Sequence, residues 1–570
     1  MLHRSAQSRP SLEEYVYYAS ITRREERVAN EESQRENETA SLKSLVKRWF
    51  SKGVAERPVQ HVQEANDSSQ KTYTEQATED NRIPALRQAV DESEWEDASR
   101  AARIVGWGNV AYLIVTDILG PSAAPWSFAQ MGYGPGFALY TVLGALSAYS
   151  GWILWKVFIQ LDSDRYPIRN YADIFLRLFG PGMKHFVNVA QAIQLVMVLG
   201  VVILINGQAI SQMSYGVNGD SKGLCFIVCL LVFTLAGCLV AQIRTLQRLG
   251  WLAHFAVWLS LLTVFILMGL VSHYPPNFGA VAATFGPQWE PGPIRTFAGA
   301  PPDEFLTGGT GFVATINGLN QVMLCYGGTA FFIFFLAEMR RPLDFWKSLF
   351  VAQTFIYVVY VVFGMYIYHW HGQFTYNPAI QGISNPRWQI GLNAINLVSS
   401  LITCGLYANI GVKIAYIELF EPLLHLPPLT SPAGKVWWAC LVPLYWSLGF
   451  IVGAAIPQLA SISGLIAAIF SGGFTYILPA LVAIVFWVRM DATLETERFE
   501  PASQVTTHED KGLSRYYRGF MKRPMFNLFN VVYFIAGIVG CGLGCYAAIH
   551  QLSFAFRAGI ATSFTCASPV

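Results

Sequence analysis

The chain has 570 residues, of which 53% are hydrophobic and only 13% are charged, and its mean hydropathy is +0.36. This composition is too apolar for a soluble protein of that length and indicates an integral membrane protein. The formal net charge of +2 gives no reason to expect a nucleic-acid partner.

Residues 1–103 form the first section of the chain, and they contain no long apolar run. Such a segment cannot bury enough apolar surface to offset the entropy it would lose on folding. We therefore expect a largely disordered tail before the first membrane helix.

Eleven apolar segments follow, each long enough to cross the roughly 30 Å hydrocarbon core as a helix of about 20 residues. They lie near 104–130, 136–159, 185–212, 223–243, 249–272, 311–337, 346–370, 390–418, 435–456, 459–489 and 526–551. Residues 490–525 form a loop before the last helix, and 552–570 form a short tail after it. The fold class predicted is an all-α integral membrane protein.

The basic residues of the loops fix the orientation of these helices. Alternate loops carry 18 Lys and Arg residues on one side and four on the other, which are Lys222, Arg295, Arg387 and Arg557. The more basic side is expected to be cytoplasmic. The N-terminal tail and the 490–525 loop are then cytoplasmic, and the C-terminus lies outside.

Two of the predicted helices are interrupted. The first is broken at 120–125 (Gly-Pro-Ser-Ala-Ala-Pro) and the sixth at 326–329 (Tyr-Gly-Gly-Thr). Lipid cannot satisfy the backbone groups freed by a break, so breaks persist where protein or a water-filled cavity does so. Each break lies in the first helix of a set of five, and the two sets span 104–272 and 311–489. Because five is an odd number, the second set enters the membrane from the opposite side and is inverted relative to the first. Paired breaks in inverted halves indicate a transporter whose substrate binds between them.

All nine cysteines lie beyond residue 220, mostly in apolar runs, and no cluster of His or carboxylate residues accompanies them. We expect packed thiols rather than a metal site or a disulfide framework. No metal and no cofactor are predicted.

Several motifs then resemble one family. They lie at 120–125 with Phe128 and Gly132, at 170–173, at 179–182 running on to Gln191 and Gln194, at 337–345, at 406–413, at 462–465 and at 477–480. In this order they resemble the amino acid/auxin permease family, and the helix 8 motif is similar to that of fungal neutral amino acid permeases. The resemblance spans about residues 100–550. It implies a fold like that of the sodium-coupled transporter LeuT, with 5+5 inverted repeats and helices 1 and 6 unwound.

The helix ends at the breaks suggest the substrate. The half-helix that begins at the first break presents free N–H groups to a carboxylate, and the half-helix that ends near Cys325 presents carbonyls to an ammonium group. A zwitterionic amino acid fits this pair of ends. The predicted substrate-binding residues are Gly120, Ser122, Ala123, Ala124, Gln191, Gln194, Tyr326, Gly327, Gly328, Thr329, Phe331, Ser400 and Cys404, with Phe332 and Phe474 as further candidates. Packing is the alternative role for the side chains outside the breaks.

Four charged or titratable residues are candidates for coupling or gating: Asp117, His254, Glu338 and Lys413. Asp117 lies three residues before Gly120, where it could bind a proton or sodium or simply cap loosened backbone. A charge inside a membrane span is costly enough to suggest a function. Sodium-using relatives carry an Asn at the position of Ile114, and its absence here argues against sodium and favours protons. They also carry a Gly-His pair at the position of Gly327-Gly328, and the absence of that His removes one partner for a proton or for the substrate.

The sequence thus predicts a proton-coupled symporter for neutral amino acids, in the plasma membrane rather than the vacuolar membrane, and not an enzyme. A transport-dead amino acid receptor that signals through the N-terminal tail is the alternative. A membrane prenyltransferase is a poorer match, because Asp162 and Asp164 form the only close acidic pair and no paired DxxxD motif occurs.

Overall fold

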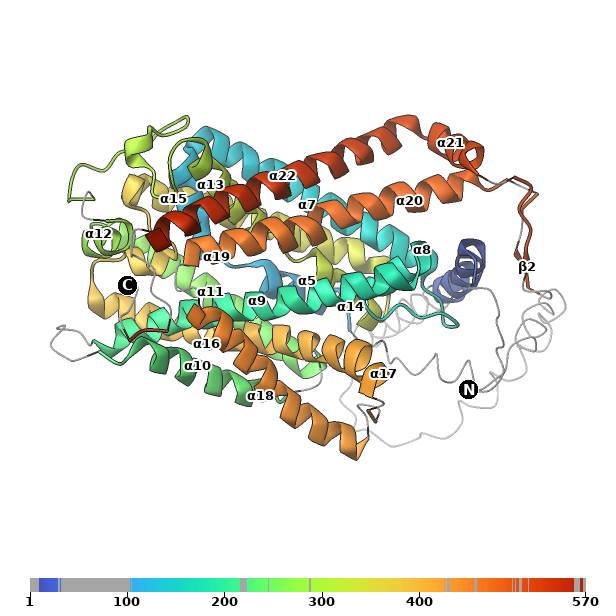
Figure 1. The fold of residues 1–570 in the computed structure, drawn as a ribbon, viewed down its shortest axis with the longest axis horizontal. Helices are drawn as coiled ribbons and strands as arrows, with labels where there is room; N and C mark the ends of the chain where they lie inside the picture. The colour runs from blue at the N-terminus through green and yellow to red at the C-terminus, as the bar shows by residue number, and fades with distance from the viewer. Residues whose placement is uncertain are drawn as a thin grey trace, which may run out of the picture.

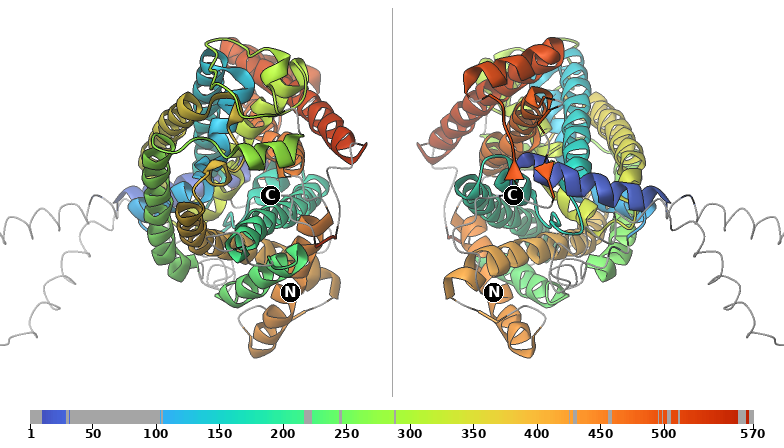
Figure 2. Two further views of the ribbon diagram at one scale, coloured as in Figure 1. Left: turned by 90° about the vertical axis from the view of Figure 1, so that its left-hand side faces the viewer. Right: turned by 90° about the vertical axis from the view of Figure 1, so that its right-hand side faces the viewer.

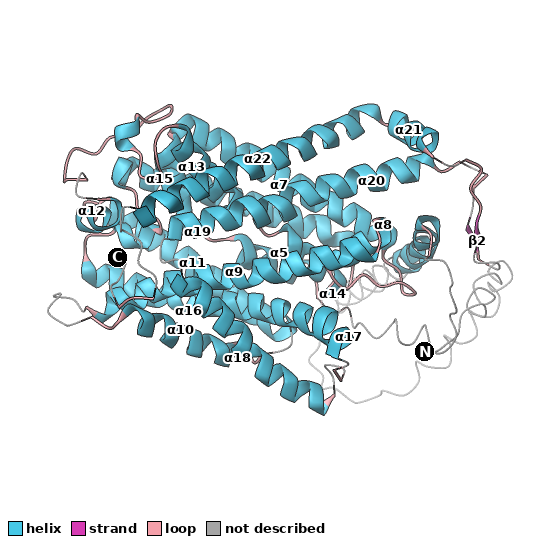
Figure 3. Cartoon of the chain, in the orientation of Figure 1, coloured by secondary structure: helices cyan, strands magenta, loops and turns pink. Residues whose placement is uncertain are grey.

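The computed structural model describes residues 10–28, 31, 103, 105–215, 223–243, 246–286, 289–424, 426–427, 431–455, 459–494, 496–497, 499–501, 505–510, 512–557 and 564–566. These residues form a bundle of long helices (Figures 1 and 3). The strands β1 (Phe499–Glu500) and β2 (Val505–Thr506) pair as a short antiparallel hairpin. The fold is therefore predominantly helical, as the composition predicts.

The long helices follow the apolar segments of the sequence. They are α7 (Tyr133–Leu161), α9 (Pro181–Ser214), α10 (Phe226–Val240), α11 (Leu246–Val271), α15 (Phe345–His371), α16 (Pro386–Ile414), α18 (Pro432–Ala455), α20 (Leu478–Ala492) and α22 (Pro524–Arg557). Shorter helices are α8 (Tyr171–Leu178), α12 (Phe278–Phe285), α17 (Glu421–Leu424), α19 (Leu459–Ile466) and α21 (Leu513–Lys522).

The two interrupted segments are each built from two helices. The first consists of α5 (Trp107–Ile118) and α6 (Ala124–Met131), and the second of α13 (Phe312–Cys325) and α14 (Phe332–Glu338). Within the described residues, nine helices are long and apolar enough to cross a membrane, and the second broken segment is counted as one of them. The α5–α6 segment and the 15-residue α10 fall outside that count because each helix in them is short.

Local sequence explains where several helices begin. Asn170 and Asp173 form a capping box at the start of α8, each side chain accepting a backbone N–H of the other residue. Asn385 caps α16, which opens with Pro386, a residue suited to a first turn because its nitrogen needs no partner there. Gly180, with φ of +103°, turns the chain sharply into α9.

Helix α9 lies at the centre of one side of the bundle, where it packs on α8, α10, α16 and α18 (Figure 1). Helix α15 packs on α5, α6 and α7, and α13 packs on α6, α19 and α22. Large apolar side chains are exposed on the outside, among them Leu239, Phe265 and Phe350. Exposed apolar surface on this scale suits contact with lipid rather than water.

One end of the bundle is covered by a helix of residues 12–28, which we call the N-helix. The N-helix lies across this end beside the β1–β2 hairpin, as the right-hand view of Figure 2 shows. The expectation of a disordered tail did not include this helix, and most of the remaining tail lies outside the described residues. We call this end of the bundle the N-helix end.

Polar contacts hold the N-helix in place. Arg23 pairs with the buried carboxylate of Asp162 at 2.5 Å, and Arg103 pairs with the same carboxylate at 2.7 Å. The hydroxyl of Tyr166 donates to Glu14 at 2.6 Å. The N-helix therefore joins the α7–α8 loop to the residue leading into α5.

A disulfide between Cys225 and Cys566 marks the opposite end, which we call the disulfide end. It fastens the segment after α22 to the start of α10. The expectation that all the cysteines are packed thiols is wrong for this pair. The partners are 341 residues apart, and their meeting depends on the path of the whole bundle, which spacing along the chain does not reveal.

Candidate functional site

Both broken helices are interrupted near the middle of the bundle. In the first, Leu119 and Gly120 separate α5 from a 3₁₀ turn at Pro121–Ala123 that runs directly into α6. In the second, residues 326–328 separate α13 from a 3₁₀ turn at Thr329–Phe331 that runs into α14. Pro121 and Pro125 lie in first turns, where a missing N–H costs nothing.

One tyrosine of α15 contacts the backbone of both breaks. The Tyr360 hydroxyl accepts a hydrogen bond from the Gly120 N–H at 3.1 Å and donates to the Ile118 carbonyl. It also lies 3.0 Å from the carbonyl oxygen of Cys325, the last residue of α13. Tyr360 is fully buried. It thus holds the two unwound segments together, and the Gly120 N–H is already paired.

Asp117 occupies the last turn of α5 and faces the second break. Its Oδ2 is buried and has no hydrogen-bond partner among the described residues. Gly328 lies so close that a methyl group there would overlap Oδ2. The Tyr407 hydroxyl, from α16, donates to the Asp117 main-chain carbonyl at 2.9 Å. Asp117 therefore sits where both breaks and α16 meet.

A main cavity of about 250 Å³ adjoins the breaks. Of the predicted substrate residues, Gly120, Ser122, Ala123 and Ser400 line it, and Asp117 lines it too. One wall is apolar and comes from α9, and another carries the polar residues of α16. The α9 residues are Val198, Val201, Val202 and Ile205; the α16 residues are Asn396, Ser399, Ser400, Thr403 and Tyr407.

The other predicted substrate residues do not line the main cavity. Gln194, Gly327 and Phe331 line a small cavity of about 60 Å³ on its N-helix side, together with Asp117 and Tyr407. The Thr329 hydroxyl donates to the Phe474 carbonyl at 3.2 Å. Buried positions away from the main cavity hold Ala124, Gln191, Tyr326, Cys404, Phe332 and Phe474.

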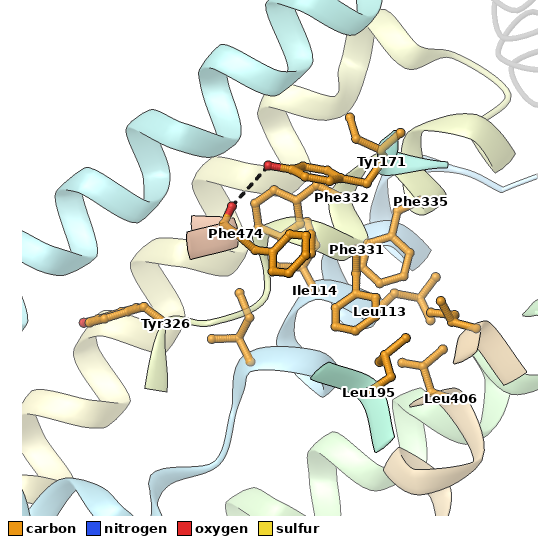
Figure 4. Packing of buried hydrophobic residues seen from close by; sticks show 14 of the residues in the cluster. Leu113, Ile114, Tyr171, Leu195, Tyr326, Phe331, Phe332, Phe335, Leu406 and Phe474 are labelled. Carbon is orange, nitrogen blue, oxygen red and sulfur yellow. Dashed lines mark hydrogen bonds between the residues drawn. The ribbon is translucent and has the colours of Figure 1, made fainter. Parts of the chain in front are cut away.

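Phe474 belongs to a stretch of π-helix that links α19 to α20, at Ala467–Ser471 and Gly473–Ile477. Besides Thr329, the Tyr171 hydroxyl donates to its carbonyl at 3.3 Å (Figure 4). Wide turns of this kind free carbonyl groups, and they occur frequently at functional sites. Here the freed carbonyl anchors the second break.

Apolar side chains close the path from the breaks toward the N-helix end. Figure 4 shows Phe331, Phe332 and Phe335 gathered with Leu195 and Leu406, and all five are buried. The Phe331 ring stacks on Tyr407 with centroids 5.7 Å apart. The chain before α5 is also joined to the end of α14, because Val105 N–H donates to the Glu338 carbonyl at 3.0 Å.

A second large cavity, of about 570 Å³, opens beyond this closure at the N-helix end. Glu338 and Lys413, two of the predicted gating residues, line it with Lys184 and Glu418. The ammonium group of Lys184 pairs with Glu418 at 2.9 Å and with Asp173 at 3.2 Å. The described residues that line this cavity are all different from those that line the main cavity.

His254 lies away from these cavities. Its Nε2 is 3.2 Å from the Asn109 amide oxygen, and its ring lies on Tyr112 with centroids 3.9 Å apart. These contacts attach α11 to the first turns of α5.

Tyr360 and Tyr407 were not among the predicted site residues. Tyrosines are common packing residues in apolar helices, and neither lies near a break in the sequence. The available signal was chemical: a buried phenol needs a hydrogen-bond partner, and the freed backbone groups at a break need one as well.

The chain is similar to known transporters over most of its length. Residues 105–490 match the family described as "Transmembrane amino acid transporter protein", and the chain belongs to this family. A "Transmembrane transporter" of Gibberella moniliformis is 24% identical over 429 residues, 73% of this chain and 85% of that protein. The same name is given to a Fusarium pseudograminearum protein, 24% identical over 82% of this chain and 87% of its own length.

An "N amino acid transport system protein" of Neurospora crassa is 21% identical over 475 residues, 81% of this chain and 88% of that protein. The chain is therefore a multi-pass membrane protein of an amino acid transporter family, which is a family of transporters and not of enzymes.

Proposed function

We propose that the protein is a secondary active transporter of neutral amino acids and that protons drive it. The observation that carries the proposal is the pair of broken helices at one cavity. At the main cavity the half-helix that begins at Pro121 offers the unpaired N–H groups of a first turn. Helix α13 ends at Cys325, whose carbonyl contacts the Tyr360 hydroxyl and keeps a second lone pair for another donor. A carboxylate suits the first end and an ammonium group suits the second.

Because the Gly120 N–H is already bonded to Tyr360, we place the carboxylate site at residues that follow Gly120 in the chain. The amides of Ser122 and Ala123 belong to the first turn of the new half-helix, and both residues line the cavity. These two positions are the proposed carboxylate site.

The lining of the cavity supports a neutral side chain on the substrate. Asp117 is the one Asp, Glu, Lys or Arg among the described residues that line it. The apolar wall of α9 and the hydroxyl and amide groups of α16 can contact an uncharged side chain, and neither offers a counter-charge.

Asp117 is the proposed proton carrier. It reaches the main cavity, and its Oδ2 is buried without a partner among the described residues. An ionised carboxylate in that position would cost several kcal/mol, a cost that a bound proton removes. One proton crossing 100 mV contributes roughly 2.3 kcal/mol, and one pH unit adds about 1.4 kcal/mol. Together they would support an accumulation of roughly 500-fold.

The proposed orientation places the N-helix end in the cytoplasm. The 18-to-4 distribution of basic residues in the loops supports it. So does the disulfide at the opposite end, because disulfides persist in oxidising compartments outside the cytosol. The plasma membrane is the proposed location.

A panel of radiolabelled amino acids, tested in cells that express the protein, is the decisive experiment. Neutral amino acids should accumulate and should compete with one another, and a proton ionophore should abolish accumulation. A chain that binds amino acids and moves none of them would instead be a receptor. Accumulation that survives the ionophore but requires sodium would overturn the choice of coupling ion.

A further inference from the structure

A row of polar side chains runs along the buried face of α9, from the small cavity beside Asp117 to the cavity at the N-helix end. The row consists of Gln194, Gln191, Asn188 and Lys184. Their spacings of three, three and four residues place them on one face of the helix. At 1.5 Å per residue, the row spans about 15 Å, which is half of a hydrocarbon core of about 30 Å.

The three amide side chains of this row are buried, and each has at least one polar atom without a hydrogen-bond partner among the described residues. The exposed fractions of Asn188, Gln191 and Gln194 are 0%, 0% and 3%. Neither amide atom of Gln191 has a partner among the described residues, and the same is true of Gln194 Oε1 and Asn188 Oδ1. Leaving a buried polar atom unpaired is costly, so we expect these amide groups to bind a small polar molecule.

The two ends of the row open into cavities. Gln194 and Asp117 both line the small cavity, and its volume of about 60 Å³ exceeds the roughly 10–15 Å³ that one water requires. At the other end, Asn188 Nδ2 donates to Glu418 at 3.1 Å, and Glu418 lines the cavity at the N-helix end together with Lys184.

We propose that water molecules bind along this row and carry the proton from Asp117 to the N-helix end. The inference rests on the proposed function, in which Asp117 holds the proton. The Asp117 carboxylic acid gives its proton to the first water and becomes a carboxylate. The charge then moves along the waters, which the amide groups hydrogen-bond, and leaves as hydronium in the N-helix-end cavity.

Among the described groups at the Asp117 end of this route, Asp117 is the one that can release a proton at neutral pH. Tyr407 of α16 and Cys325 of α13 share cavities with it, and Tyr360 of α15 lines the main cavity. Phenols and thiols are ordinarily uncharged at neutral pH. At the far end the charged groups are more numerous: Asp173, Lys184, Glu338, Lys413, Glu418, Arg103, Arg165, Arg169 and Arg177.

Purified protein in vesicles tests the route, with alanine as probe, because proton entry and amino acid exchange can be measured separately there. Gln191→Leu should lower alanine-driven proton entry at least about tenfold, since an apolar side chain interrupts the waters. Exchange of alanine across the membrane should continue, because exchange needs no proton release. Gln208→Leu is the matched control: it changes the same residue type on α9, buried and with Oε1 unpaired, but beyond the main cavity. Alanine-driven proton entry in the Gln208→Leu variant should equal that of the wild type.

Gln191→Ser separates the route from simple packing and serves if the Leu variant does not fold. Serine leaves room for water and keeps a hydroxyl, so coupling should stay within about twofold of wild type. If Gln191 served only for packing, the opposite result is expected: coupling would be kept in the Leu variant and reduced in the Ser variant. Normal coupling in the Leu variant, or lost coupling in the Ser variant, would overturn the route alone. Wild-type vesicles that exchange alanine without moving protons would overturn proton coupling and the route together.

Discussion

The carboxylate of Asp117, in the first broken helix, lies directly against Gly328, in the second. The absence of a side chain at Gly328 is what lets the proposed proton carrier reach the other break. The two interruptions thus form one structural unit, joined here by van der Waals contact and a few ångströms away by the hydroxyl of Tyr360.

Gly328→Ala should disrupt this contact. The added methyl group overlaps Oδ2 of Asp117, so either the carboxylate or the second break must shift. We expect accumulation of substrate to fall about tenfold or more, because small displacements at such a site are costly. Gly473→Ala is the control, since a methyl group there meets no atom within 4 Å. Uptake normalised to the amount of protein at the surface is the measurement, and equal uptake in the two variants would contradict the account.

Tyr360→Phe should loosen both breaks at once. The change leaves the Gly120 N–H and the Ile118 carbonyl without their partner, at a cost of roughly 1–3 kcal/mol for each unpaired group. The apparent affinity for substrate should therefore weaken. Tyr357→Phe removes a phenol of the same helix that bonds Thr141 on α7 instead, and it should leave the affinity unchanged. Binding titrations on both purified variants distinguish a local effect from a general loss of folding.

Asp117→Asn should mimic a permanently protonated carboxyl group. Substrate should still exchange across the membrane, but it should no longer be concentrated, and the dependence of uptake on external pH should flatten. If Asp117 only supports the backbone, asparagine will serve nearly as well. In that case the accumulation ratio will keep its wild-type pH profile.

The hairpin beside the N-helix should resist acid. Burial by itself would raise the pKa of Glu497, but hydrogen bonds from Arg515 and from the Leu494 and Glu509 amides outweigh it and lower the pKa to about 2. A depressed pKa means that the carboxylate stabilises the folded segment above its ordinary value of 4.5, and that this stability is lost as the pH falls toward about 2.

Hydrogen exchange of residues 494–515 at a series of pH values measures this effect. Protection should persist at pH 5 and fall below about pH 4. Glu497→Gln should remove protection already at neutral pH. Glu509→Gln keeps the main-chain amide that bonds Glu497 and changes only an exposed carboxylate, so its profile should match wild type.

Proteolysis in intact cells tests the orientation and the disulfide together. A protease that cuts the 273–310 loop from outside should produce two fragments. They should stay together on a gel until the disulfide is reduced, because Cys225 and Cys566 lie on opposite sides of the cut. Cys566→Ser should release the fragments without reduction. Cleavage only after the cells are opened would reverse the proposed orientation.

The sequence was informative where the physical constraint is local. Apolar length predicts the helices, because each must satisfy its own backbone hydrogen bonds in lipid. Gly120-Pro121 and Gly327-Gly328 reveal the breaks, because Gly and Pro are the residues that most often interrupt a helix. Contacts between distant segments were not predictable. Tyr360 meets Gly120 across 240 residues, and Arg23 meets Asp162 across 139 residues. Nothing in the spacing of either pair along the chain marks it as a contact.

The N-helix escaped prediction for a related reason. Its charged side chains resemble those of a solvated tail. They become structural because Asp162, Tyr166 and Arg515 lie at one end of the bundle, where they pair with Arg23, Glu14 and Glu13. The composition of the tail describes the tail alone. It carries no information about a complementary surface formed by residues elsewhere in the chain.

The disulfide also sets a limit on motion. It holds the start of α10 within 4.4 Å, Cα to Cα, of the segment that follows α22. Helix α10 packs on α9 and α18, whereas α22 packs on α13, α19 and α20. The bond therefore ties the segment after α22 to the α10 and α18 side of the bundle, where the Phe226 N–H also donates to the Cys566 carbonyl and the Phe564 N–H donates to the Ala454 carbonyl. In the proposed transport cycle, the start of α10 and the segment after α22 should therefore move together, and the larger displacements are expected toward the N-helix end.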